Sequence, residues 1–211
     1  MENLQTIANA VYDGESETVA EYTRKTIEEG FSAVEILEKG LMVGMDRVGV
    51  DFKNGDLFIP EVLVASRAMQ AGMEILKPLL MTQEVKTPGK IVLGTVQGDL
   101  HDIGKSLVSI MLQGAGFEVI DLGVDVSTEK FLEAITTHKP DLVGMSSLLT
   151  TTMPQMEANI KAIEKAGLRN SVQIMVGGAP LTESYANSIG ADGYAQNSSL
   201  AVDKAKELLG K

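Results

Sequence analysis

The stretch from Gly94 to Lys105 joins a short apolar segment to a helical one, and this junction constrains the fold more than any other part of the chain. Residues 90–96 read as a buried strand that begins after a Pro-Gly pair. Apolar residues then recur at helical spacing over 107–112, until Gly114 ends the run. The sequence therefore predicts a strand-to-helix turn, which in an open parallel sheet lies at the carboxyl edge, where ligands bind.

The remainder of the chain repeats this alternation of strand and helix. Strands are expected at 90–96, 118–122, 141–146, 172–176 and 193–195, with a helix after each. Repeated units of this length give a parallel sheet with right-handed crossovers and helices on both faces. The predicted fold class of residues 91–211 is α/β, and Ser127 is expected to cap one of its helices.

The first part of the chain has a different pattern. Residues 1–85 read as four helices on short connections, which predicts an antiparallel four-helix bundle. The segment Asp51–Asp56 is expected to be a turn, with a long helix from Ile59 to about Met81 after it. Residues 86–90 contain Pro-Gly and are predicted to link this bundle to the α/β domain.

Composition excludes several function classes. The 211 residues carry a net charge of −11, which argues against nucleic acid and against an anionic membrane surface as partners. Cysteine is absent, so disulfides, thiolate metal sites and cysteine nucleophiles are excluded. The sequence shows neither a long apolar span nor a basic-then-apolar leader, and we expect a cytoplasmic protein without a membrane partner.

His101, one of two histidines, is the candidate for chemistry within the strand-to-helix turn. Asp99 can accept the proton of the ring nitrogen that does not bind a metal, which orients the ring and raises its basicity. Gly104 has no Cβ, so a flat ligand could approach the start of the helix closely. The competing interpretation is a solvated loop histidine, which the complete Asp-x-His-x-x-Gly pattern between strand and helix disfavours.

This motif, Asp99-Leu100-His101-Asp102-Ile103-Gly104, resembles the cobalamin-binding signature of methionine synthase, corrinoid methyl-carrier proteins and coenzyme-B12 mutases. The resemblance implies that His101 replaces the cofactor's dimethylbenzimidazole as the lower axial ligand of cobalt, with Asp99 as its hydrogen-bonding partner. It also implies a flavodoxin-like strand order 2-1-3-4-5. The cofactor-binding residues expected from this loop are Gly98, Asp99, Leu100, His101, Asp102, Ile103 and Gly104.

Two later strand ends match the same family. Ser146-Ser147-Leu148 and Gly177-Gly178 resemble its Ser-x-Leu and Gly-Gly signatures, although each alone is common loop material. By this resemblance Ser146, Leu148 and Thr150 bind the cofactor along its nucleotide tail, and Gly177 and Gly178 border the slot that holds the tail. Thr152 stands where methionine synthase has the serine of a His–Asp–Ser relay. Asp99 and Thr152 are therefore expected to couple the histidine ligand to proton uptake.

The segment 49–62 resembles the helical cap that precedes the cobalamin domain in methionine synthase and the methyl carriers. In that family an aromatic and an aliphatic residue cover the upper face of the cofactor. Phe52 and Ile59 occupy those positions and are expected to bind the cofactor in the same way. The same two residues can also be read as core residues that flank a turn.

The chain has no conspicuous general acid–base pair, metal-ligand cluster or phosphate-binding loop. It most resembles the stand-alone corrinoid proteins of methylamine, methanol and betaine methyltransferase systems. The resemblance implies a non-catalytic subunit that carries a methyl group as methylcobalamin and accepts it as cob(I)alamin. The implied partners are a substrate-specific corrinoid methyltransferase, a second methyltransferase with a tetrahydrofolate or thiol acceptor, and a corrinoid reactivation protein.

Two alternatives stay open at the level of sequence. A cobalamin-dependent sensor would use the same two domains, but its DNA-binding members carry a basic helix-turn-helix ahead of the cap, whereas this chain is acidic and its first helix is expected from about Leu4. The detached cobalamin subunit of a carbon-skeleton mutase usually lacks the four-helix cap, so residues 1–85 count against it.

Overall fold

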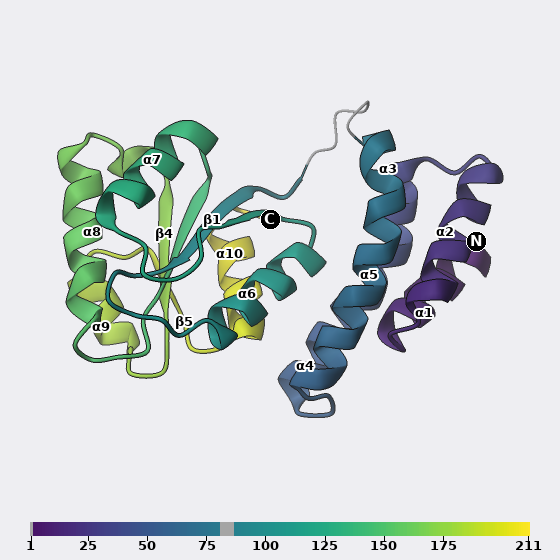
Figure 1. The fold of residues 1–211 in the computed structure, drawn as a ribbon, viewed down its shortest axis with the longest axis horizontal. Coiled ribbons are helices and arrows are strands. Elements are labelled where there is room, and N and C mark those ends of the chain that lie inside the picture. The colour runs from purple at the N-terminus through teal and green to yellow at the C-terminus, as the bar shows by residue number, and fades with distance from the viewer. Residues whose placement is uncertain (1, 81–86) are drawn as a thin grey trace. The chain divides into compact units, whose positions relative to one another are not determined.

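The computed structural model describes residues 2–80 and 87–211. The chain divides into two compact units, a helical unit before residue 87 and a sheet unit after it (Figure 1). The predicted linker, residues 86–90, begins outside the described residues, and its last residue, Lys90, is the first residue of strand β1.

The helical unit contains four helical runs on short connections, as the sequence predicts. The third run is continuous and includes one π-helical turn between two α-helical parts. Its elements are α1 (Glu2–Tyr12), α2 (Ser16–Glu28), α3 (Ala33–Ile36), the π turn (Leu37–Leu41), α4 (Met42–Asn54) and α5 (Ile59–Leu80). Fully buried side chains from these helices form the core of the unit, among them Ile7, Val19, Leu41 and Leu76. Burial of this apolar face stabilises helices that would be marginal alone.

The predicted turn at Asp51–Asp56 begins later than the sequence indicates. Residues 51–54 continue α4, and Gly55, with φ of 84°, ends that helix in the left-handed conformation. Phe52 therefore lies in the last helical turn of α4, and Ile59 is the first residue of α5. The expected end of the fourth helix, Met81, lies outside the described residues.

The sheet unit holds five parallel strands in the order β2-β1-β3-β4-β5, which confirms the flavodoxin-like order. The strands are β1 (Lys90–Thr95), β2 (Glu118–Asp121), β3 (Leu142–Ser146), β4 (Gln173–Gly177) and β5 (Gly193–Ala195). Five of the surrounding helices are α6 (Ile103–Gly114), α7 (Thr128–His138), α8 (Met153–Lys165), α9 (Glu183–Ser188) and α10 (Ser198–Leu208), and a short 3-10 turn spans Arg169–Ser171. Ser127 caps α7 by accepting a hydrogen bond from the Lys130 amide, as predicted.

Helices cover both faces of this sheet, as the strand–helix alternation predicts. Helices α7, α8 and α9 lie on one face, whereas α6 and α10 lie on the other (Figure 1). Phe131 of α7 and Ile160 of α8 pack with Val143 of β3 in the buried core under the first face. None of the helices in the described part of the chain is long and apolar enough to cross a lipid bilayer.

Strand register brings three loops to one edge of the sheet. Thr95 at the end of β1 pairs with Ser146 at the end of β3, and Ser146 in turn pairs with Gly177 at the end of β4. The loop that contains His101 and the loops after Ser146 and Gly177 therefore begin side by side. This is the carboxyl edge, where ligands of open α/β sheets bind.

Candidate functional site

Asp99 and His101 form a close pair in the loop between β1 and α6. The Oδ1 atom of Asp99 lies 2.7 Å from Nδ1 of the His101 ring and also accepts the His101 amide at 3.0 Å. The Thr95 hydroxyl donates to the carbonyl oxygen of His101 at 3.0 Å, which ties the loop to the end of β1. The backbone and the ring of His101 are thus both held in place.

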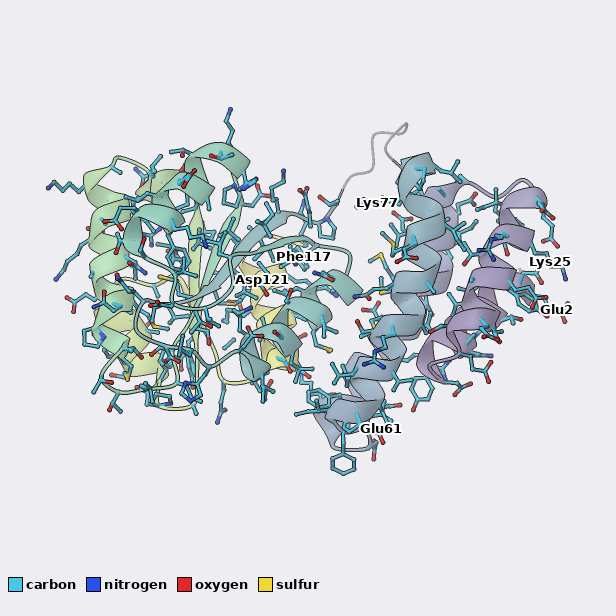
Figure 2. All side chains as sticks on the ribbon, in the orientation of Figure 1. Glu2, Lys25, Glu61, Lys77, Phe117 and Asp121 are labelled. Atoms are coloured by element: carbon cyan, nitrogen blue, oxygen red, sulfur yellow. The ribbon has the colours of Figure 1, made fainter. Side chains whose placement is uncertain are left out.

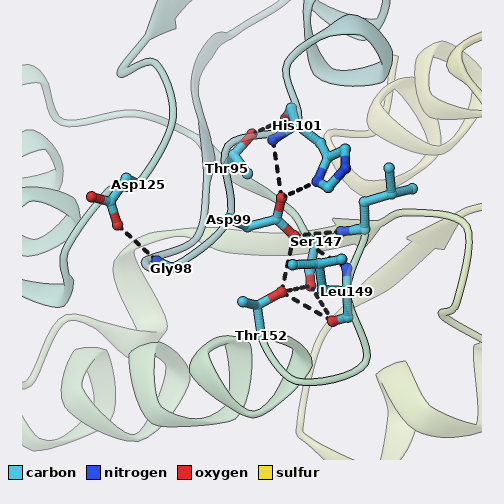
Figure 3. Close-up of polar contacts among 9 residues, drawn as sticks. Thr95, Gly98, Asp99, His101, Asp125, Ser147, Leu149 and Thr152 are labelled. Atoms are coloured by element: carbon cyan, nitrogen blue, oxygen red, sulfur yellow. Dashed lines mark hydrogen bonds and ion pairs between the residues drawn. The ribbon is translucent and has the colours of Figure 1, made fainter.

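The second carboxylate oxygen of Asp99 is held by the loop after β3. Its Oδ2 atom accepts hydrogen bonds from the amides of Leu148 at 2.7 Å and Leu149 at 3.2 Å, and from the Thr152 hydroxyl at 2.9 Å (Figure 3). Asp99 is fully buried, so these donors replace the water that it loses on folding. The carboxylate therefore joins two loops that are far apart in the sequence.

This environment determines which atom carries the proton that lies between Asp99 and His101. Burial alone would raise the pKa of Asp99, but hydrogen bonds from the His101 and Leu148 amides, the His101 ring and the Thr152 hydroxyl outweigh it and hold the pKa well below its ordinary value. An ionised Asp99 can only accept hydrogen bonds, so Nδ1 of His101 carries the proton that lies between them. In the neutral ring, Nε2 then has a free lone pair, and it points away from Asp99 (Figure 3).

Ser147 belongs to the same network, although sequence reasoning passed over it. Its hydroxyl is fully buried and lies 2.8 Å from the Thr152 hydroxyl. Either hydroxyl can be the donor in this contact, and both also lie within hydrogen-bonding distance of the Leu149 carbonyl oxygen, at 3.0 Å for Thr152 and 3.2 Å for Ser147. The only sequence signal for this role is its position within the Ser146-Ser147 pair at the end of β3.

The two loops that hold Asp99 and His101 expose several large apolar side chains. The His101 side chain is 49% exposed, while Leu100 and Ile103 are 72% and 79% exposed, unusually high for large aliphatic residues. Leu148 and Leu149 are also exposed, on the neighbouring loop. A Cβ added at Gly104 would meet no heavy atom within 4 Å. An exposed apolar patch of this kind around one polar atom fits a large, flat, mostly apolar ligand.

The single imidazole of His101 also fits a metal whose other ligands come from a macrocycle. Within residues 2–80 and 87–211, no three His, Cys, Asp or Glu side chains gather in a way that could hold a metal ion. His101 could therefore supply one ligand atom, Nε2, and the remaining ligands would have to come with the cofactor. A corrin ring meets that requirement.

Other predicted site residues have more varied surroundings. Ser146 is half-buried at the end of β3, Thr150 is exposed beyond it, and the Gly98 amide donates to Asp125 at 2.7 Å. Gly178 has a φ of 138°, and a Cβ there would lie 1.9 Å from the Ser147 carbonyl oxygen. Gly178 is thus required for the close approach of the β4 and β3 loops.

Phe52 and Ile59 belong to the helical unit rather than to the sheet unit. Phe52 is half-buried in α4, whereas Ile59 is 41% exposed at the start of α5. His138, which the sequence places on the surface, is exposed at the end of α7.

The fold and this site define a class of cofactor-binding α/β domain in which an aspartate-oriented histidine stands at the carboxyl edge of the sheet. Residues 89–203 match the B12 binding domain family, and residues 4–77 match a second family that is also described as a B12 binding domain. The chain belongs to the B12-binding family of corrinoid proteins.

Named relatives of the chain agree with this family. The chain is 48% identical to dimethylamine corrinoid protein 1 of Methanosarcina acetivorans, over 99% of this chain and 98% of the relative. The methanol:cobalamin methyltransferase complex MtaBC of Methanosarcina barkeri contains a similar structure, with a TM-score of 0.87, 31% identity, and coverage of 99% of this chain and 80% of that chain. A cobalamin-binding protein of Desulfitobacterium hafniense gives a TM-score of 0.78 at 33% identity, with coverage of 97% of this chain and 98% of that chain.

Proposed function

We propose that this protein carries a methyl group on a cobalamin cofactor between two methyltransferases, and that His101 is the axial ligand of its cobalt. The observation that carries the proposal is the half-exposed His101 ring, oriented by a buried, ionised Asp99 and close in the sequence to the exposed Leu100 and Ile103. The relative named for dimethylamine, 48% identical, favours a methylated amine as the original methyl donor.

The residues of the chain have distinct roles in this proposal. The bound corrinoid supplies the cobalt atom that carries the methyl group. His101 would hold that cobalt through Nε2, and Asp99 would keep the proton on Nδ1 of the ring. Asp99 with Thr152 would also stabilise a proton on Nε2 whenever that nitrogen does not bind the metal.

The other predicted site residues serve binding of the same cofactor. Leu100, Ile103 and Leu148 offer apolar area to the corrin from the loops around His101. Gly98 and Asp102 belong to the same loop, while Ser146, Thr150, Gly177 and Gly178 would line the path of the nucleotide tail at the strand ends that lie in register. Phe52 and Ile59 of the helical unit would cover the opposite face of the cofactor and so act as a lid.

The proposal implies protein partners. The similar MtaBC structure is titled as a methanol:cobalamin methyltransferase complex, which supports a substrate-specific corrinoid methyltransferase as the first partner. A second methyltransferase, with a tetrahydrofolate or thiol acceptor, would remove the methyl group, and a reactivation protein would restore oxidised corrinoid. These exchanges would take place in the cytoplasm.

Reconstitution with cobalamin tests the proposal. The full-length apoprotein is prepared with ¹⁵N-labelled histidine, loaded and reduced by one electron, and the axial nitrogen is identified by its hyperfine coupling to cobalt(II). We expect a labelled nitrogen in the wild type, loss of that coupling in His101→Ala, and no change in His138→Ala, which alters the other histidine. An unlabelled axial nitrogen in the wild type would rule out His101 as the ligand.

The carrier role is tested separately. The loaded protein, reduced to cob(I)alamin with a chemical reductant, is incubated with methyltransferases specific for dimethylamine, trimethylamine, betaine or methanol, together with the matching methylated substrate. Methylation of the bound corrinoid by one of them is the expected result. Failure with every system, despite a normal cobalt ligand, would instead favour a sensor that binds the same cofactor.

A further inference from the structure

Lys105 is a buried cation close to the candidate site, and the proposed function has so far given it no role. It lies in the first turn of α6 and its side chain is 2% exposed. Lysine is rarely buried to this extent unless an opposite charge accompanies it, because the ammonium group loses its hydration. The partners of this ammonium group therefore indicate what the residue does.

Two carboxylates from different parts of the sheet unit bind Lys105. Its Nζ atom lies 2.9 Å from Oδ1 of Asp102, the residue directly after His101. It also forms an ion pair with Oδ2 of Asp121, the last residue of β2, which is labelled in Figure 2. The other oxygen of Asp121 accepts the Gly123 amide at 2.9 Å. Lys105 thus connects the His101 loop to the end of a neighbouring strand.

The same segment after β2 also holds the beginning of the His101 loop. The Oδ1 atom of Asp125 accepts the Gly98 amide at 2.7 Å, and the Asp125 amide donates to the Asp99 carbonyl at 3.0 Å. Asp125 adopts a φ of 52° to make these contacts, a conformation that is uncommon for residues other than glycine. Residues 121–125 therefore bind the loop on both sides of the Asp99–His101 pair, through hydrogen bonds and one ion pair.

Fold stability alone is a weak explanation for this arrangement. A buried ion pair often contributes little more to stability than a well-packed apolar residue of similar size would, because both charges lose water. What a bridging cation does supply is a defined distance between the groups that it joins. Here those groups are the residue after His101 and a rigid strand end.

We infer that Lys105 is a positioning residue, which bridges Asp102 and Asp121 so that the His101 loop presents its ring in one orientation. This inference rests on the proposed function, in which that ring binds cobalt. Without the bridge, the loop would keep its Thr95, Ser106 and Asp125 contacts but would lose its ion pair with the end of β2, which would loosen the fit of the His101 ring against Asp99. The His101 ring would then sample several positions relative to the cofactor.

The apoprotein allows a test that needs no cofactor. The chain has two histidines, so the ring nitrogens of His101 and His138 can be followed individually by ¹⁵N NMR. In Lys105→Met we expect the His101 ring signals to broaden and to move towards a mixture of tautomers, with His138 unchanged. The matched control is Lys161→Met, which removes an exposed i,i+4 ion pair with Glu157 on α8 and should leave both histidines unchanged.

The loaded protein gives a second readout. In Lys105→Met the ratio of cofactor ligated by labelled histidine to cofactor ligated by its own base should fall by roughly tenfold or more, the size expected when one charged hydrogen-bond anchor is lost. Asp121→Asn removes the negative charge at the other end of the bridge and should give a fall in the same direction. The double variant should be no worse than either single variant, because both changes break the same link.

The results of these experiments distinguish the proposed function from the positioning role of Lys105. If the wild type lacks a labelled axial nitrogen, the proposed function fails, and the apoprotein spectra still decide whether Lys105 orients the ring. If the wild type shows that ligand and both Lys105→Met and Asp121→Asn retain wild-type spectra, the positioning role is overturned. If Lys105→Met does not fold, Asp121→Asn, which leaves the lysine in place, decides the question alone.

Discussion

The Thr152 hydroxyl lies 2.9 Å from Oδ2 of Asp99, on the opposite carboxylate oxygen from the one that holds the His101 ring. The order Thr152, Asp99, His101 therefore forms a continuous hydrogen-bonded chain from a buried hydroxyl to a half-exposed imidazole. Threonine at this position keeps the contact that a serine would make, despite its more restricted χ1.

Two substitutions of Thr152 should distinguish the contribution of its hydroxyl from that of its methyl group. Thr152→Val removes the hydrogen bond and Thr152→Ser removes a methyl group, and each should lower the free energy of unfolding by about 1 kcal/mol, measured with urea. Only Thr152→Val should also change the ¹⁵N signals of the His101 ring, because only that variant takes a donor from Asp99. Equal ring spectra for both variants would show that the hydroxyl does not act through Asp99.

Asp99→Asn should have a larger effect. The amide group of asparagine cannot accept from the Leu148 and Leu149 amides and the Thr152 hydroxyl while its oxygen faces His101, so buried donors lose their partner. We expect a loss of roughly 3 kcal/mol in urea unfolding of the apoprotein. Asp56→Asn, on the exposed turn before α5, should change stability by less than about 0.5 kcal/mol. A loss in Asp99→Asn no larger than in this control would mean that the network contributes nothing to folding.

Gly104→Ala should affect the apoprotein and the loaded protein in opposite directions. A Cβ at Gly104 meets no protein atom within 4 Å, and alanine favours the helical conformation of α6. The apoprotein should therefore gain about 0.5 kcal/mol of stability. If the corrin lies against Gly104, cobalamin affinity should fall at the same time, as measured by titration of the apoprotein. Unchanged affinity would place the cofactor away from the start of α6.

Asp125 provides a test of the loop anchor on the Gly98 side. Asp125→Ala loses the hydrogen bond to the Gly98 amide and leaves alanine at a φ of 52°, so its stability should fall by about 2 kcal/mol. Asp125→Asn keeps an acceptor oxygen and tolerates this backbone conformation, so most of the stability should be retained. Thermal unfolding of the two apoprotein variants distinguishes them, and equal losses would contradict a role for the Asp125 oxygen.

Much of the fold follows from apolar periodicity. The strand at 193–195 falls where the pattern predicts it, because a glycine marks its start. The turn predicted at Asp51–Asp56 was wrong over its first four residues, which are helical. Polar residues at 51–54 resemble a turn, but the helix ends only where Gly55 can adopt the left-handed conformation.

The central contacts of the candidate site were predictable from the sequence, but the buried polar residues next to them were not. Asp99, His101 and Thr152 come together as the family resemblance implies, since parallel strands deliver their loops to one edge. Ser147 and Lys105 could not be assigned in advance, because a serine pair does not reveal which member is buried and a lysine is ordinarily exposed. The position of Phe52 and Ile59 over a cofactor stays a prediction.

The two amides that hold Asp99, those of Leu148 and Leu149, have a consequence for mutational studies of this protein. A scan that truncates side chains leaves both donors intact, so it would understate how much the loop after β3 supports the imidazole. Proline at either position deletes the N–H itself, and a one-residue change in loop length displaces it. Either change would reveal how much the two backbone amides contribute. The length of this loop is therefore as much a determinant of how the His101 ring is held as any single side chain in it.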